Sequence, residues 1–420
     1  MKPMKIKLLL LIFTLSFGKF GHTQIWFAVE SGTSANLYSV DFIDGGIGIA
    51  VGASGTVLKM AEGVSSWDLI NTGYSNDFNA VRVIDNDRII IGGDGGLILH
   101  SADSGTTWEV VQQSGQDYDI YGLDIDRMSG HGIAGGSGNT LIWTNNFGLN
   151  WTYIEGGYMS SYYCACMANA DFGAVAGSNS IFQPLIGYTM DGGQSFTGQS
   201  FYPTFGGTGN EGNARDCYFF DSDNGFFVGA LWDGQGFITK EINWGTQFWD
   251  AIAFDQPIYA VSFLNQDKGV VAGGNNNIPL IAETNDGGYS WEYAEVTGAN
   301  GKMNDVVMVG STGYAVGQSG EILKRDYMPG ITEENLAGKI TIRPNPAPDF
   351  ATIHISLQSS QPVEIVLYDL AGRVLQNVFS GTLPAGSTSI EMNIDNLPAG
   401  LYYLKLQGRE FSANEKVVVR

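Results

Sequence analysis

The chain has 420 residues, of which 43 are acidic and 21 are basic, so its formal net charge is −22. A charge of this sign disfavours nucleic acid and anionic membranes as partners, because phosphate binding depends on clustered lysine and arginine. The 58 glycines are typical of a chain with many turns.

The N-terminus has the pattern of a targeting segment. Three lysines within the first seven residues precede the apolar run Leu8–Phe17, which is too short to span a bilayer. We therefore expect a secretory signal peptide over residues 1–23, cleaved before Gln24. Since no second apolar run is long enough, we expect no membrane span in the rest of the chain.

Residues 24–327 repeat a unit of 40 to 52 residues. In each unit a short apolar strand ends in a glycine; these anchor glycines are Gly52, Gly92, Gly135, Gly177, Gly229, Gly273 and Gly317. A fixed period near 45 residues with alternating strands and no helical periodicity is typical of a β-propeller. The sequence predicts an all-β protein, a seven-bladed β-propeller followed by a small C-terminal β-sandwich.

The predicted ring closes through its first strand. The seventh unit ends without a fourth strand, and the missing strand has its counterpart in Trp26–Glu30, which matches the strands that begin at Trp67, Trp108 and Trp291. We expect this strand to complete the last blade and so cover an edge that would pair with other chains. We expect a monomer.

A second repeat lies in the turns of the same units. It reads SADSGTTW, TMDGGQSF and TNDGGYSW, with weaker copies at Thr144–Trp151 and Met60–Trp67. This pattern is identified as the Asp-box, or bacterial neuraminidase repeat. Its carboxylate accepts hydrogen bonds from backbone amides of the turn, and its glycine adopts positive φ. Its aromatic residue anchors the next strand by apolar packing. The structural positions are Asp103, Gly105, Trp108, Asp191, Gly193, Phe196, Asp286, Gly288 and Trp291.

The whole propeller segment resembles the photosystem II stability/assembly factor-like propellers. The matching blocks include Gly48–Gly52 with Gly55–Leu58, and Gly313–Gly317 with Gly320–Leu323. The resemblance implies a seven-bladed fold, and its photosynthetic members chaperone assembly intermediates through basic surface residues. This acidic chain has no such basic cluster, so the architecture is the part that carries over.

The sequence does not predict an active site. A sialidase needs three converging arginines, and repeat alignment places only Arg82 and Arg215 on inner strands, with Arg88 and Arg127 at turns on the opposite end. An extracellular hydrolase that uses rim carboxylates such as Asp233 remains an alternative. The four histidines are scattered and Asp221–Gly225 is interpreted as a turn, so we expect no metal and no cofactor.

A ligand is expected on the rim opposite the Asp-boxes. The loop before Cys217 is enlarged there, and neighbouring loops add an indole and several amides. The candidate ligand-binding residues are Tyr202, Phe205, Trp232, Asp233, Asn275 and Asn276. Aromatic and amide groups on loops of a rigid scaffold suit an extracellular glycan or protein. Two alternatives remain: Phe201 and Phe205 packing under their own loop, and a purely structural surface protein.

The three cysteines lie on two predicted inner strands of adjacent blades. Cys164 and Cys166 are two residues apart, and Cys217 follows in the next blade. Because residues i and i+2 of a strand seldom have disulfide geometry, we expect buried free thiols, with a Cys166–Cys217 disulfide as the alternative.

The composition changes after the propeller. Residues 328–338 form a polar linker, and residues 339–420 alternate strands with Pro-Asn-Pro and Pro-Ala-Gly turns. Pro344–Pro346, Tyr368–Arg373, Leu397–Tyr402 and Lys416–Arg420 closely resemble the C-terminal sorting domain of the type IX secretion system. The resemblance implies the type IX secretion machinery as a partner and a secreted or outer-surface location. A fibronectin-like adhesion module would share the fold class without requiring the terminal motif.

Overall fold

The computed structural model describes residues 25–326 and 338–419, with gaps at 62–65, 113–117, 155–158, 181–182, 201–203, 206–207, 210–211, 243–246, 249–250, 311, 344–346, 348–349, 358–359, 369–372, 385, 396, 399 and 409–411. The chain divides into two compact units, Met1–Tyr327 and Met328–Arg420. The predicted signal peptide and nearly all of the predicted linker lie outside the described residues. No helix in the described part is long and apolar enough to cross a membrane.

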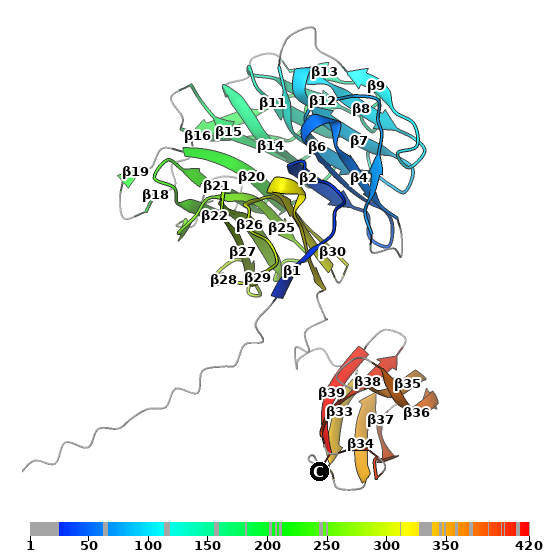
Figure 1. Ribbon diagram of the computed structural model, residues 1–420. Helices are drawn as coiled ribbons and strands as arrows, with labels where there is room; N and C mark the ends of the chain where they lie inside the picture. Colours follow the sequence, from blue (N-terminus) through cyan, green and yellow to red (C-terminus); the bar gives the residue numbers. More distant parts are fainter. Residues whose placement is uncertain are drawn as a thin grey trace, which may run out of the picture. The chain divides into compact units, whose positions relative to one another are not determined.

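The first unit is a series of antiparallel sheets in chain order, which we call blades 1 to 7 (Figure 1). Blade 1 contains β2 (Leu37–Phe42), β3 (Gly48–Gly52), β4 (Val57–Met60) and β5 (Asp68–Ile70). Blade 2 contains β6 (Phe78–Val83), β7 (Ile89–Gly93), β8 (Ile98–Ser101) and β9 (Glu109–Gln112). Blade 3 contains β10 (Ile120–Ile125), β11 (Gly132–Gly136), β12 (Leu141–Thr144) and β13 (Thr152–Tyr153). Blade 4 contains β14 (Ser161–Met167), β15 (Gly173–Ser178), β16 (Pro184–Thr189) and β17 (Thr197–Ser200).

The later blades carry additions to this plan. Blade 5 contains β20 (Gly212–Asp221), β21 (Asn224–Leu231), β22 (Gly236–Ile242), β23 (Gln247–Phe248) and β24 (Ile252–Phe254). Blade 6 contains β25 (Ile258–Phe263), β26 (Gly269–Asn275), β27 (Ile278–Thr284) and β28 (Glu292–Tyr293). Blade 7 contains β30 (Met303–Val309), β31 (Thr312–Gly317), β32 (Ile322–Asp326), β1 (Ile25–Val29) and β29 (Glu295–Thr297). A separate hairpin, β18 (Thr204–Phe205) with β19 (Thr208–Gly209), precedes blade 5.

The N-terminal strand closes the ring, as the sequence predicts. Strand β1 pairs antiparallel with β32, and β29 adds to it in parallel, so strands from the two ends of the unit lie in one sheet (Figure 1). Trp26 of β1 is fully buried, and its indole Nε1 donates to Glu283 Oε1 of blade 6 at 2.7 Å. The parallel strand β29 was not predicted from the sequence.

Apolar packing joins every blade to the next. Seven clusters of buried side chains each combine residues from two successive blades, and one of them unites Leu37 and Leu58 of blade 1 with Val316 and Ile322 of blade 7. Because each blade buries both of its faces against neighbours, the described residues form a closed β-propeller.

The second unit is a β-sandwich, described here by itself. One sheet contains β33 (Gly338–Arg343), β34 (Phe350–Leu357) and β37 (Gly386–Asn393). The other contains β36 (Val374–Leu383), β35 (Gln361–Tyr368), β38 (Gly400–Gly408) and β39 (Ser412–Val419). Buried side chains from both sheets, including Ile353, Ile365 and Leu404, form its core. The sandwich predicted from the sequence is confirmed, although Pro344–Pro346 and most of the Tyr368–Arg373 motif lie outside the described residues.

Candidate functional site: the central channel

The inner strands of all seven blades surround one cavity of about 1130 Å³. Its lining comes from β2, β6, β10, β14, β20, β25 and β30 and the residues beside them. This cavity is the central channel of the propeller, and we call the end at which these strands begin its mouth.

Every inner strand carries a β-bulge near the mouth. In blade 1, Leu37 pairs with Gly52 and Ser39 with Val51, so Tyr38 has no partner across the sheet. The same register shift occurs in the other six blades. A bulge leaves one residue outside the ladder and re-aims its side chain. The seven extra residues, which we call the bulge ring, all line the channel: Tyr38, Asn79, Tyr121, Tyr163, Arg215, Tyr259 and Asn304.

The anchor glycines are the counterparts of these bulges. A Cβ on Gly52 would lie 2.0 Å from the Asn36 carbonyl oxygen, and one on Gly317 would lie 2.3 Å from that of Lys302. In blades 2 and 3 the residues just before the bulge, Phe78 and Ile120, pair with Gly93 and Gly136. The glycines expected from the sequence, Gly92 and Gly135, are wrong by one residue, because each of these strands ends in two glycines.

Aromatic and cationic side chains pack together in the bulge ring. Tyr121 and Tyr163 stack with ring centroids 5.8 Å apart, and the Arg215 guanidinium lies over the Tyr163 ring at 4.4 Å. The Lys302 ammonium lies over Tyr259 at 4.6 Å. Burial raises the pKa of Tyr121 and Tyr259, and the Tyr121 hydroxyl donates to Asp119 Oδ2 at 3.2 Å. The mouth therefore presents phenols, amides and two cations.

Carboxylates deeper in the channel connect neighbouring blades. Inner strands lie with one edge toward the channel, and backbone amides on that edge donate hydrogen bonds to carboxylates of the preceding blade. Asp305 accepts from Val40, Asp41 from Val83, Asp124 from Met167 and Asp216 from Val261, at 2.7–2.9 Å. These carboxylates satisfy backbone donors that no strand covers, which is a structural role.

Two arginines complete this belt of charges. Arg82 Nε lies 2.9 Å from Asp124 and its Nη1 3.6 Å from Asp41, while Arg127 Nη2 lies 2.9 Å from Asp41. Arg127 starts from a turn, as predicted, but its side chain reaches back to the channel lining. Arg82 and Arg215 are on inner strands, as predicted.

Two channel carboxyl groups have strongly perturbed acidity. Burial raises the pKa of Asp305 to about 6. The pKa of Asp216 is raised well above its usual range, first by burial and then by the charge of Asp305. Among the described residues, no group of three or more His, Cys, Asp or Glu side chains has a metal-binding arrangement.

Among the candidates whose side chains are described, Trp232, Asp233, Asn275 and Asn276, none lines the channel. Tyr202 lies outside the described residues, and Phe205 belongs to the short hairpin β18–β19, which Figure 1 shows at the edge of the propeller. Trp232 is 59% exposed on the turn between β21 and β22, where Asp233 accepts the Gln235 amide of its own turn.

The two candidate amides lie on the same rim, at the turn between β26 and β27. Asn275 caps that turn by accepting from the Asn277 amide. Asn276 accepts from the Gln318 side chain, and the Gln318 amide donates to the carbonyl of Lys302. The predicted rim and the channel mouth are thus adjacent. The bulge ring was missed, although each of its members stands 13 to 15 residues before the glycine that faces its bulge.

The recurring turns have the geometry expected from the sequence. Asp103 accepts from the Thr107 amide and hydroxyl, which lowers its pKa, and Trp108 Nε1 donates to the Gly105 carbonyl. Asp191 and Asp286 make the same bonds with Ser195 and Ser290. The copy at Thr144–Trp151 keeps the pattern with Asn146. In the decayed copy, whose residues 62–65 are not described, the Trp67 indole has no hydrogen-bond partner in the described part of the chain.

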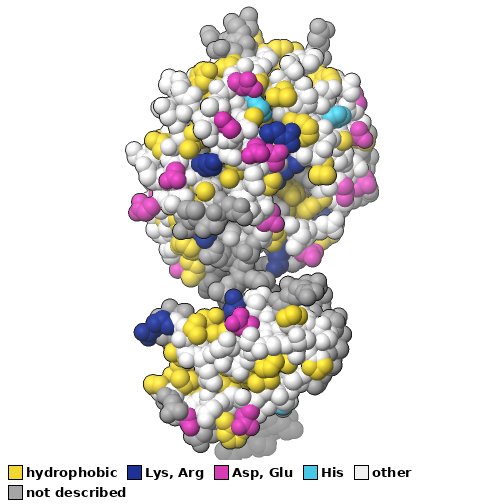
Figure 2. Space-filling model, turned by 90° about the vertical axis from the view of Figure 1, so that its right-hand side faces the viewer, with side chains coloured by type: hydrophobic (Ala, Val, Ile, Leu, Met, Phe, Trp, Pro, Cys, Tyr) yellow, Lys and Arg dark blue, Asp and Glu magenta, His cyan; other side chains and the backbone are white. Residues whose placement is uncertain are grey.

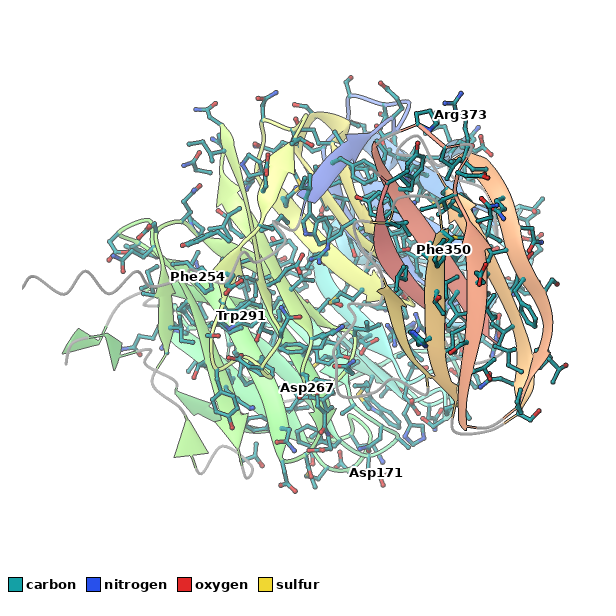
Figure 3. All side chains as sticks on the ribbon, turned by 90° about the horizontal axis from the view of Figure 1, so that it is seen from below. Asp171, Phe254, Asp267, Trp291, Phe350 and Arg373 are labelled. Carbon is teal, nitrogen blue, oxygen red and sulfur yellow. The ribbon has the colours of Figure 1, made fainter. Side chains whose placement is uncertain are left out.

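These turns lie on the rim opposite the mouth. Each docks on the turn between the first two strands of its own blade: the Gly192 amide donates to the carbonyl of Asp171 and the Gly287 amide to that of Asp267, both residues labelled in Figure 3. Trp291, the closing aromatic of blade 6, packs edge to face on Phe254 of blade 5, and both are labelled in the same view.

The three cysteines are free and gathered between blades 4 and 5. Cys164 and Cys217 are buried, as expected, and their sulfur atoms lie 2.7 Å apart. Cys166 lines the channel. Cys166 is also within hydrogen-bonding reach of Cys217, so both thiols of β14 lie beside the thiol of the next blade. Burial raises the pKa of Cys164 to about 11.

Comparison with known proteins agrees with both units. A family model described as secretion system C-terminal sorting domain matches residues 341–420, and one described as photosynthesis system II assembly factor YCF48 matches residues 20–153. The second unit is thus similar to sorting domains, and the first three blades are similar to the assembly-factor propellers. No curated protein matches the chain.

Solved structures show the propeller fold at low sequence identity. YCF48 bound to D1 peptide aligns with a TM-score of 0.57 and 16% identity over 72% of this chain and 96% of its own. YCF48 from Cyanidioschyzon merolae gives 0.56 and 16% over 72% and 98%. The WD40 β-propeller domain of Doa1 gives 0.57 and 14% over 73% and 97%. Likeness at this identity concerns the fold alone.

Proposed function

We propose that this protein is a non-catalytic recognition protein that binds an extracellular glycan or protein at the mouth of its channel. The bulge ring carries the proposal. Seven equivalent positions hold four tyrosines, two asparagines and one arginine around an open cavity, whereas the blade interfaces behind them repeat apolar packing. Polar groups that converge on a preformed cavity suit ligand binding.

We assign Trp232, Asp233, Asn275 and Asn276 to the outer part of this proposed surface, while the roles of Tyr202 and Phe205 stay predictions from the sequence. Its nearest support is the connection from Asn276 through Gln318 to Lys302. The name of the solved structure of YCF48 bound to D1 peptide indicates that a propeller of this fold holds a peptide, which supports a protein ligand beside a glycan.

The test is an array of glycans and peptides probed with the wild type, Tyr121→Ala and Trp232→Ala. Tyr293→Ala is the control, because Tyr293 is 58% exposed on the outer strand β28, away from the channel. Losing an anchor aromatic should weaken binding by about 1–3 kcal/mol, and the control should bind like the wild type. Equal binding by all variants would place the site elsewhere.

Export is proposed to follow the type IX route, to the outer cell surface or beyond. The sorting domain supports this, since it matches residues 341–420. Truncation after Asp326 in a host with that system should leave the propeller in the periplasm. The truncated chain reaching the medium in normal amount would contradict the assignment.

A hydrolase is the second candidate, favoured by one observation. Asp216 and Asp305 both line the cavity with raised pKa values, and perturbed carboxyl pairs in clefts are candidate catalytic groups. Both already accept backbone amides, which favours the structural role. Product release from any array ligand, abolished in Asp216→Asn but not in Asp233→Asn, would promote the enzyme.

A further inference from the structure

One arginine of the propeller differs from the other four. Arg82, Arg88, Arg127 and Arg325 each form an ion pair with an aspartate or glutamate. Arg215 has no ion pair within the described residues, although the chain carries 43 acidic residues. Figure 2 shows acidic side chains dispersed over the visible face of the propeller rather than gathered in one patch. An unpaired arginine is therefore notable in this chain.

The side chain of Arg215 is held in place by a ring contact, but one of its donors is not satisfied. Its guanidinium lies over Tyr163, yet its Nε–H is buried and has no hydrogen-bond acceptor among the residues that the structure describes. A buried donor without an acceptor costs free energy unless a ligand or water supplies one. The guanidinium is planar and presents its donors as a fork that matches a carboxylate.

A second cation lies close to Arg215. Lys302, held over Tyr259, also forms no ion pair in the described part of the chain. Its pKa is lowered, first by burial and then by the positive charge of Arg215. Two like charges near one another at a cavity mouth are unfavourable without an anion between them, and an anion would relieve both the repulsion and the buried donor.

We propose that Arg215 and Lys302 form an anion site that binds the carboxylate of a uronic acid residue at the end of a glycan. The inference rests on the proposed function and adds that the ligand is negatively charged. A single terminal carboxylate fits better than a polyanion, because the net charge of −22 repels a long acidic chain.

The remaining lining favours a sugar over a peptide end. The Tyr38 and Tyr121 hydroxyls donate to Asp77 and Asp119, and their oxygens can still accept. Asn79 and Asn304 likewise keep side-chain oxygens after donating to the carbonyls of Ile120 and Leu37. Hydroxyl and amide groups match the many hydroxyls of a sugar ring. Tyr163 is stacked between Tyr121 and Arg215, so neither face of its ring is open to a ligand. The positive charge of Arg215 is therefore the main attraction for a ligand at this point.

The first experiment tests the anion site alone. Trifluoroacetate serves as the carboxylate probe, and its ¹⁹F signal is followed during titration with Arg215→Gln, Lys302→Gln and the double variant. Lys240→Gln is the matched control, since Lys240 also lies over a tyrosine, Tyr289 at 4.4 Å, but does not line the channel. Arg215→Lys tests rescue by charge, and thermal melting verifies that each variant folds.

The second experiment identifies the source of the carboxylate. Calorimetry compares a glucuronate-terminated disaccharide, its neutral glucose-terminated counterpart and a short peptide with a free C-terminus. The wild type should prefer the glucuronate probe, salt should weaken binding, and the double variant should lose about tenfold or more while Lys240→Gln retains it.

Three results would overturn the inference in distinct ways. Unchanged trifluoroacetate binding in the double variant, or none in the wild type, would remove the anion site. A preference for the peptide would remove the glycan as occupant. Equal binding of neutral and acidic disaccharides would refute the charge requirement and leave the proposed function standing, whereas failure of every array ligand would refute the proposed function itself.

Discussion

Replacing Trp26 should destabilise the whole propeller, because this side chain holds the ring closed. It is fully buried between blades 6 and 7, on the one strand that comes from the other end of the unit. Its Nε1 donates to Glu283, a carboxylate that is itself only 4% exposed and also contacts Arg325 of β32. Two blades therefore meet through one indole.

The size of the effect depends on which part of the side chain is removed. Trp26→Ala loses the buried ring and leaves a cavity, which typically costs about 3–5 kcal/mol of unfolding free energy. Trp26→Phe keeps most of the apolar contact but removes the hydrogen bond to a buried charged group, a loss of about 1.5–3 kcal/mol. Phe27, the next residue, is 38% exposed on the other face of β1, so Phe27→Ala should cost clearly less.

Urea unfolding followed by circular dichroism and tryptophan fluorescence measures these differences. Size-exclusion chromatography adds a second readout, because a detached β1 exposes the edge of β32 to pairing with another chain. The reasoning is refuted if Trp26→Ala unfolds at the same urea concentration as Phe27→Ala.

Three further predictions concern other parts of the propeller. Gly288→Ala should lower the unfolding free energy by about 2–4 kcal/mol, since φ is +83° and the new Cβ would lie 2.5 Å from the Phe226 ring. Gly73→Ala is the control: its φ is +82° with nothing within 4 Å, so only the smaller backbone cost should appear. Equal melting temperatures of the two variants would contradict this. Asp305 has a folded-state pKa of about 6, above its unfolded value of about 3.9, so the folded state holds this proton more tightly and stability is lost as pH rises through that interval. Between pH 4 and 7 the wild type should lose up to roughly 3 kcal/mol relative to Asp305→Asn in unfolding titrations, and a pH-independent difference would be incompatible with the raised pKa. Treatment with a disulfide exchange reagent should join Cys164 to Cys217, which mass spectrometry would detect as a loss of two hydrogens. Closing a separation of 53 residues should raise the unfolding free energy by about 4 kcal/mol. Three thiols that still titrate after the treatment would exclude the bond.

Repetition made the fold predictable from one sequence. A single anchor glycine or a single Asp-box would be weak evidence, but each recurs at a spacing that matches the strands of one blade. The closing strand could be identified by the same argument, because Trp26 occupies the position that Trp67 and Trp108 hold in complete units. Strand β29 has no parallel counterpart in the other blades as far as the structure describes them, so repetition could not reveal it.

The candidate site was less accessible because loop length was taken as the signal. The enlarged loop at Tyr202 and the exposed Trp232 differ from the average unit, and that difference attracted the prediction. The channel depends instead on a small displacement within a regular strand. A bulge shifts one residue out of the alternating pattern, so Tyr38 and Arg215 look like ordinary strand residues until the register is known.

The anchor glycine and the bulge ring are two consequences of the same backbone feature. The bulge brings a carbonyl into the space where a side chain on the facing strand would lie, which requires glycine at Gly52 and Gly177. It also turns one side chain per blade toward the channel without a partner across the sheet. Packing and hydrogen bonding of the blade therefore fix the glycine but leave the bulged residue free to vary. Chemistry that differs among blades concentrates at these seven positions, and for this reason the single cation among them, Arg215, indicates a ligand more strongly than any residue on the outer rim.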